Sequence, residues 1–158
     1  MSTVATTELI PTLTLLLRTM VSSSCPKMQR KGPTSSPTER VKVQRIFDSL
    51  LFELHSWGVP ISERICPEVG FVDRNDAYAV TYKLEGDRYK VNITNLIWKE
   101  YSNISEAVKN ILAHECVHTV EGCFNHGALW KYWVNWLNAE HGFKINPRPF
   151  SEKPTNLY

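Results

Sequence analysis

The sequence predicts one α+β domain with an N-terminal helix, a small antiparallel three-stranded sheet and two consecutive helices. Three observations predict this class. Apolar residues recur at helical spacing over residues 38–57, β-rich runs separated by turn signals follow over residues 65–94, and two amphipathic helical patterns occupy residues 103–141. The chain has 158 residues, 42% of them hydrophobic, which is enough to bury one core.

The two ends of the chain differ in composition from the rest. Residues 22–37 are rich in Ser, Pro, Lys and Arg, so we expect residues 1–37 to be a flexible N-terminal extension. The apolar run over residues 13–17 is too short to span a membrane, and no basic region precedes it as in a signal peptide. We expect residues 147–158 to be an irregular C-terminal tail, which leaves residues 38–146 as the folded domain.

The net charge of the chain is only +2, which does not favour nucleic acid as a partner. We expect a monomer that does not associate with membranes. Four cysteines stand at positions 25, 66, 116 and 123 without a CxxC pair, so they predict neither a zinc ribbon nor a disulfide framework. Scattered cysteines of this kind are typical of a reducing compartment, which predicts a cytoplasmic, intracellular protein.

The helix expected over residues 38–57 ends at Gly58-Val59-Pro60. Its apolar residues form one stripe of the kind that packs into a core. The stripe consists of Val43, Ile46, Phe47, Leu50, Leu51 and Leu54.

Three strands are expected over residues 69–72, 78–84 and 89–93. Turn signals at residues 73–76 and 85–87 separate them, and such short turns predict antiparallel neighbours. The sequence leaves the structure of residues 95–101 ambiguous.

The next helix is expected to begin at Asn103, with Glu106 as a reciprocal capping partner, and to end at Gly122. Its inward face has 4-3-4 spacing. A second helix is expected over residues 128–141, packed against the first. The inward face of the first helix consists of Ala107, Ile111, His114 and His118, and the apolar arc of the second consists of Leu129, Trp130, Trp133, Trp136 and Leu137.

Three of the five histidines fall within residues 114–126. His114 and His118 lie one helical turn apart, so their imidazoles can converge on one metal ion. Glu115 stands beside them, where a carboxylate can act on a water at the metal. His126 follows a turn and is the expected third ligand.

Two other residues are rivals for the third position: Cys123, because thiolates bind zinc well, and Glu140 from the following helix. Cys116 is about 200° around the helix from His114 and should face away from the metal. The metzincin pattern requires Gly at position 121 and His at position 124, where this chain has Glu121 and Phe124.

The stretch from Ile111 to Gly142 resembles the SprT-like (Spartan-type) zinc metallopeptidase family. The resemblance rests on the motifs Ala113-His114-Glu115, His118-Thr119, Gly122-Cys123 and Asn125-His126-Gly127, followed by Trp130. It implies a zincin-like fold with one zinc ion per chain, held by His114, His118 and His126, and with Glu115 as the general base. The sequence contains no counterpart of the family's zinc ribbon or DNA-binding segments, so DNA is a partner only by family resemblance.

The motif therefore predicts a zinc-dependent peptidase that hydrolyses peptide bonds through a metal-activated water, with a protein or peptide substrate. Zincins bind substrate along an edge strand, which the sequence does not identify, and Tyr101 and Tyr132 are candidates for oxyanion stabilisation. Two alternatives remain: a zinc-containing DNA- or protein-binding module without proteolytic activity, and a helical protein in which the histidines bind no metal.

Overall fold

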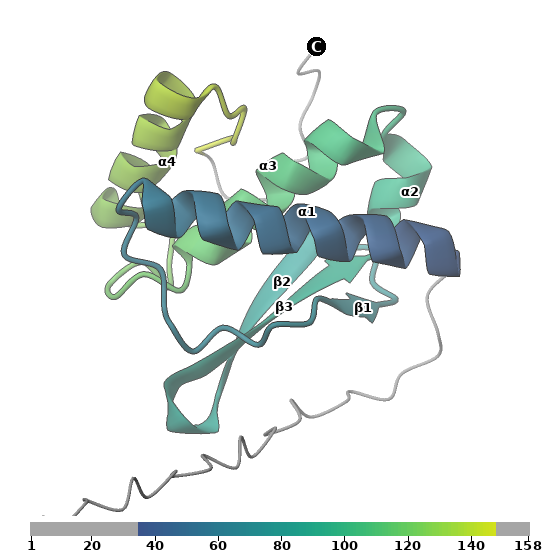
Figure 1. Cartoon of the computed structure of the whole chain (residues 1–158), viewed down its shortest axis with the longest axis horizontal. Helices are drawn as coiled ribbons and strands as arrows, with labels where there is room; N and C mark the ends of the chain where they lie inside the picture. Colours follow the sequence, from purple (N-terminus) through teal and green to yellow (C-terminus); the bar gives the residue numbers. More distant parts are fainter. Residues whose placement is uncertain (1–34, 148–158) are drawn as a thin grey trace, which may run out of the picture.

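The structure is a computed structural model that describes residues 35–147, and every structural statement below refers to this range. It is an α+β fold of four helices and a small sheet (Figure 1). None of the helices in this range is long and apolar enough to cross a membrane. The elements are, in chain order, α1 (Pro37–Ser56), β1 (Gly70–Val72), β2 (Ala79–Leu84), the 3-10 turn η1 (Glu85–Asp87), β3 (Arg88–Thr94), α2 (Leu96–Glu100), α3 (Ile104–Val117) and α4 (Ala128–His141).

Nearly all of the expected extension over residues 1–37 and of the expected tail over residues 147–158 lies outside the described residues. The first described residues differ slightly from expectation, because α1 begins at Pro37 with Ser36 as its N-cap. The Ser36 hydroxyl accepts from the Glu39 amide at 3.2 Å, and the Glu39 carboxylate accepts from the Ser36 amide at 2.6 Å. This reciprocal capping box fixes the start of the helix.

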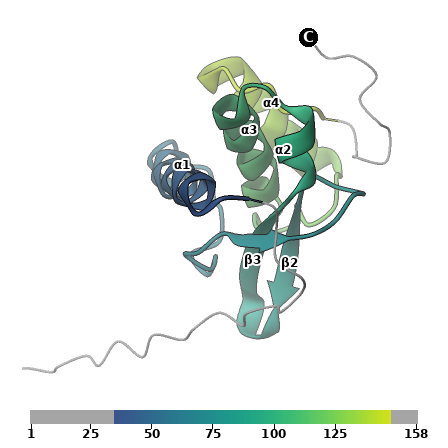
Figure 2. The ribbon, with the colours of Figure 1, turned by 90° about the vertical axis from the view of Figure 1, so that its right-hand side faces the viewer.

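Helix α3 is the central element of the fold. It contacts the helices α1, α2 and α4 and the strands β2 and β3. Figure 2 shows α3 between α1 and α2, with α4 behind it and the β2–β3 hairpin extending away from the helices. Because α3 is surrounded in this way, most of its side chains are buried, including the polar His114 and Glu115. Side chains near its C-terminal end therefore lie in a largely dry environment.

The sheet differs from the antiparallel arrangement that the sequence predicted. Its order is β1-β3-β2: β2 pairs antiparallel with β3, whereas β1 pairs parallel with β3. The segment between β1 and β2 is not a tight hairpin, because it passes over the end of β3. There the carbonyls of Ala77 and Tyr78 accept from the Thr94 hydroxyl at 2.6 Å and the Thr94 amide at 2.9 Å. The short turn signals therefore predicted the strands correctly but not the pairing of β1.

Helix α3 also ends earlier than expected. Its regular turns stop at Val117, and tighter bonds from the amides of Thr119 and Val120 continue the chain to a turn at Gly122. Gly122 adopts a φ of 78°, so it does reverse the chain as a glycine stop does. Only half of the expected cap is present: Asn103 accepts from the Glu106 amide, but the Glu106 carboxylate pairs with Lys144 at 2.7 Å.

Helix α4 has the predicted bounds, and its apolar arc faces the core except at Leu129. Trp130, Val134 and Leu137 are buried, while Leu129 is 46% exposed. Trp133 and Trp136 are partly buried and pack against the core as well, so the wide apolar arc is confirmed except at Leu129.

Phe47 is buried in the core, and Phe52 on the same helix is 75% exposed. We expect Phe47→Ala to lower the free energy of unfolding by about 3–5 kcal/mol, because it removes core contacts and leaves a cavity. Phe52→Ala should change it by less than about 0.5 kcal/mol. Urea unfolding followed by circular dichroism measures both, and similar losses for the two variants would contradict the packing described here.

Candidate metal centre

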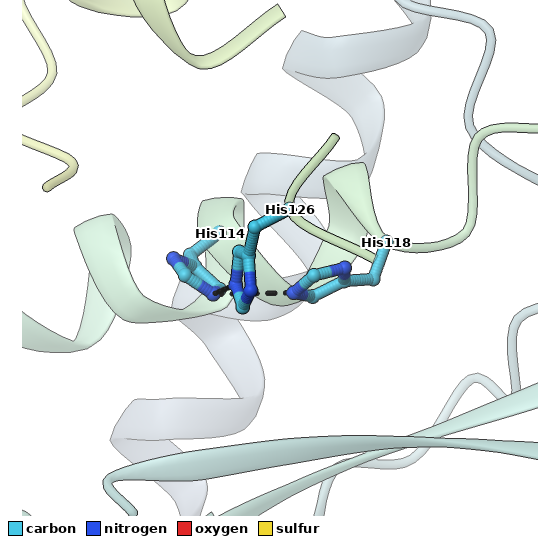
Figure 3. A group of neighbouring side chains, drawn as sticks. All are labelled: His114, His118 and His126. Atoms are coloured by element: carbon cyan, nitrogen blue, oxygen red, sulfur yellow. Dashed lines mark hydrogen bonds between the residues drawn. The ribbon is translucent and has the colours of Figure 1, made fainter. Parts of the chain in front are cut away.

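Three imidazoles meet at the C-terminal end of α3. Figure 3 shows His114, His118 and His126 with their ring nitrogens directed at one another. The Nε2 atom of His114 lies 3.2 Å from Nε2 of His118 and 3.1 Å from Nε2 of His126. One ligand atom from each of the three residues lies within 4.8 Å of the other two. Among residues 35–147, no other group of three or more His, Cys, Asp or Glu side chains is placed to hold a metal ion. The three histidines are thus close enough to hold a metal ion.

These separations can be compared with those of a tetrahedral ion. Metal–nitrogen bonds of about 2.0–2.1 Å place neighbouring ligand nitrogens about 3.3–3.4 Å apart. The His114 nitrogen is 0.1–0.3 Å closer than that to the nitrogens of His118 and His126, so a small outward movement would admit an ion. The residues therefore fit a metal both in donor type and in spacing.

The local chain path brings the third histidine to the first two. His114 lies in the last turn of α3, and His118 is its C-cap. The turn at Gly122, with the Cys123 amide bonded to the Val120 carbonyl at 2.9 Å, reverses the chain. His126 then lies two residues before α4. The ten-residue return loop therefore closes a site that the helix alone could not complete.

Neighbouring groups fix the orientation of the rings. The Nδ1 atom of His118 lies 2.9 Å from the Cys123 carbonyl oxygen, which can only accept. Nδ1 therefore carries the proton, and Nε2 presents its lone pair to the cluster. The buried ring of Trp130 lies against all three imidazoles, with centroid distances of 4.7 Å to His114, 5.5 Å to His118 and 4.5 Å to His126. The sequence predicted Trp130 only as core packing.

The environment keeps the three imidazoles neutral. Burial lowers the pKa of His114 well below its ordinary value of 6.5, and the nearby His118 and His126 lower it further. Burial also lowers the pKa of His118, partly offset by its bond to the Cys123 carbonyl, and it lowers the pKa of His126. Neutral imidazoles are the form that binds a metal, so little proton displacement is needed near neutral pH.

Glu115 lies beside the histidine cluster. Its Oε1 atom is 4.0 Å from Nε2 of His114, and its Oε2 atom accepts from the Thr81 hydroxyl at 2.7 Å. Burial raises the pKa of Glu115 to about 7, although the hydrogen bond from Thr81 acts in the opposite direction. The carboxylate is thus close to the cluster without being one of its three members. Sequence reasoning missed Thr81, which is 34 residues away on β2.

The rival ligands are not in the cluster. The cluster of described residues consists of the three histidines alone, Cys123 contributes its backbone carbonyl to His118, and Glu140 is exposed. Cys116 is fully buried, as expected for a side chain facing away from the histidines, and burial raises its thiol pKa.

The cysteines only partly match the expected pattern. Cys116 and Cys123 are free and buried, whereas Cys66 is disulfide-bonded. A disulfide disagrees with the expectation of four isolated cysteines in a reducing compartment. The cytoplasmic location stays a prediction.

The two tyrosines proposed for oxyanion stabilisation pack elsewhere in this structure. Tyr101 contacts Tyr78 at a centroid distance of 5.3 Å, and Tyr132 contacts Trp133 at 5.2 Å. Both are exposed at the surface. Their role stays a prediction.

Comparison of the chain with protein-family models, with curated proteins and with solved structures found no match. The resemblance to SprT-like peptidases therefore rests on the motif residues alone.

The cluster predicts one bound metal ion per chain. We expect His126→Ala to reduce the metal retained after dialysis by at least tenfold, because the loop then offers no third ligand. His55→Ala removes a histidine from α1 and is the matched control, which should keep full stoichiometry. Elemental analysis after loading with zinc measures both. Full retention in His126→Ala, or loss in Cys123→Ala or Glu140→Ala, would contradict the ligand set.

Proposed function

We propose that this protein is a zinc-dependent peptidase whose metal ligands are His114, His118 and His126 and whose general base is Glu115. One observation carries the proposal. The buried Oε1 atom of Glu115 lies 4.0 Å from Nε2 of His114, and the Nε2 atoms of His118 and His126 meet that same nitrogen. A bound zinc ion would act as a Lewis acid: it would polarise the scissile carbonyl and lower the pKa of the water bound to it.

The donor set favours a catalytic site over a structural one. Structural zinc sites are closed by four ligands, commonly cysteines, whereas catalytic sites use three protein ligands and keep one position open. Here three histidines form the cluster and the nearby thiols of Cys116 and Cys123 stay outside it. Three neutral imidazoles also favour zinc over the hard cations that prefer oxygen ligands.

Glu115 performs the proton transfers in this proposal. Its carboxylate takes a proton from the attacking water as the water oxygen forms a bond to the carbonyl carbon of the peptide. It then gives that proton to the departing amide nitrogen as the carbon–nitrogen bond breaks. The products are a carboxylic acid and an amine, and the second proton of the water then passes from the acid to the amine to give a carboxylate and an ammonium group. Glu115 returns to its starting state. A raised pKa suits both halves of this exchange, because the group must accept a proton and later release it.

The sheet offers a place for an extended substrate. In the order β1-β3-β2 the strand β2 is at an edge, and it is the strand whose Thr81 reaches Glu115. A peptide paired with the outer edge of β2 would therefore run past the carboxylate. This position suits protein segments in an extended, unfolded conformation. Recognition of DNA has no support beyond the family resemblance.

A variant of the base tests the mechanism. We expect Glu115→Gln to retain zinc, because the amide can still accept from Thr81, and to lower kcat for casein hydrolysis by about 100- to 10,000-fold. Glu121→Gln, an exposed position in the same segment, is the matched control and should keep wild-type kcat.

Zinc-loaded wild-type protein that cleaves neither casein nor short unfolded peptides would refute the peptidase proposal and favour the binding module. Wild-type activity in Glu115→Gln would instead refute the role of Glu115 alone.

A further inference from the structure

Thr81 makes a long-range contact to the candidate base that the histidine motif does not include. Its hydroxyl oxygen lies 2.7 Å from Oε2 of Glu115 and 3.0 Å from the Glu115 backbone carbonyl oxygen. A hydroxyl has one proton to donate, and the shorter distance favours Oε2 as its acceptor, so this hydroxyl links β2 to α3 at the position next to His114. Glu115 is 4% exposed, so little water can replace the contact if it is lost.

The contact determines which carboxylate oxygen faces the histidines. A glutamate side chain has three rotatable bonds, and its neighbours must select one conformer. With Oε2 held by Thr81, the free oxygen Oε1 is the one that lies 4.0 Å from Nε2 of His114. Rotation away from this arrangement would leave a buried carboxylate oxygen without its donor, which is unfavourable.

The strand makes the donor rigid. Thr81 lies opposite Val91 in the antiparallel β2–β3 pair, and Val91 is fully buried. Ala79, which shares its face of β2, is also buried in the core. A β-branched residue in a strand has few χ1 conformers, so the hydroxyl is held where the sheet places it. Strand β2 therefore holds the carboxylate of Glu115 through the Thr81 hydroxyl, while α3 holds the Glu115 backbone.

We infer that Thr81 is a positioning residue for Glu115: it anchors Oε2 so that Oε1 faces the three-histidine centre. This inference rests on the proposed peptidase function for its kinetic consequence. The anchoring itself is a property of the protein that can be measured without catalysis.

Thr81→Val and Thr81→Ser separate the hydroxyl from the shape of the side chain. Val keeps the branched shape and removes the donor, whereas Ser keeps the donor. We expect Thr81→Val to lower kcat roughly 10- to 100-fold, with KM and zinc stoichiometry near wild type. Its melting temperature should fall by a few degrees, because a buried carboxylate oxygen loses its donor. Thr81→Ser should recover most of the lost kcat. Thr94→Val is the matched control. It also removes a threonine hydroxyl from the sheet, but that hydroxyl donates to the Ala77 carbonyl and not to Glu115, so this variant should keep wild-type kcat.

Crystal structures of the zinc-loaded wild type and of the two Thr81 variants provide the readout that does not depend on activity. We expect the Glu115 carboxylate to keep its orientation in Thr81→Ser and to rotate away from His114 in Thr81→Val. An unmoved carboxylate in Thr81→Val, or equal kcat in wild type and Thr81→Val, would overturn the inference. Equal losses of kcat in Thr81→Val and Thr81→Ser would also overturn the inference. An inactive wild type would refute the peptidase proposal, and the crystal structures would still decide whether Thr81 anchors Glu115.

Discussion

The convergence of three imidazole nitrogens is the constraint on which the rest of this site depends. Each neutral ring directs a lone pair or a single proton at the same small volume, and one proton can bridge only one pair of nitrogens at a time. Protonated rings would repel one another, and burial already disfavours their charge. A metal cation would satisfy all three nitrogens at once, without a carboxylate as a fourth member of the cluster.

The fold supports this arrangement by making α3 its central element. Helix α3 carries His114 and Glu115 and ends at its C-cap His118, and its position between α1, α4 and the sheet excludes water from them. The return loop brings His126, and α4 contributes Trp130 as a wall against all three rings. Strand β2 approaches from the other side with Thr81. The return loop, α4 and β2 therefore each place a specific group at the C-terminal end of α3.

The sequence predicted those parts of the structure that depend on local patterns. The helices at residues 37–56 and 128–141 follow from apolar spacing, and the meeting of His114 with His118 follows from the helical repeat. The position of His126 was predicted from one glycine turn. The parallel pairing of β1, the exposure of Leu129 and the bond from Thr81 to Glu115 were not predicted. Each of them depends on which segments distant in sequence become neighbours, and turn signals or periodicity do not encode that information.

X-ray absorption spectroscopy of the zinc-loaded protein at the zinc edge tests the central claim most directly, because it counts and identifies the atoms bound to the ion. We expect three imidazole nitrogens and at least one further light atom at about 2.0–2.1 Å, with imidazole scattering beyond the first shell. Sulfur at about 2.3 Å would show that a cysteine holds the metal instead. That result, or fewer than three imidazoles, would contradict a centre built from His114, His118 and His126.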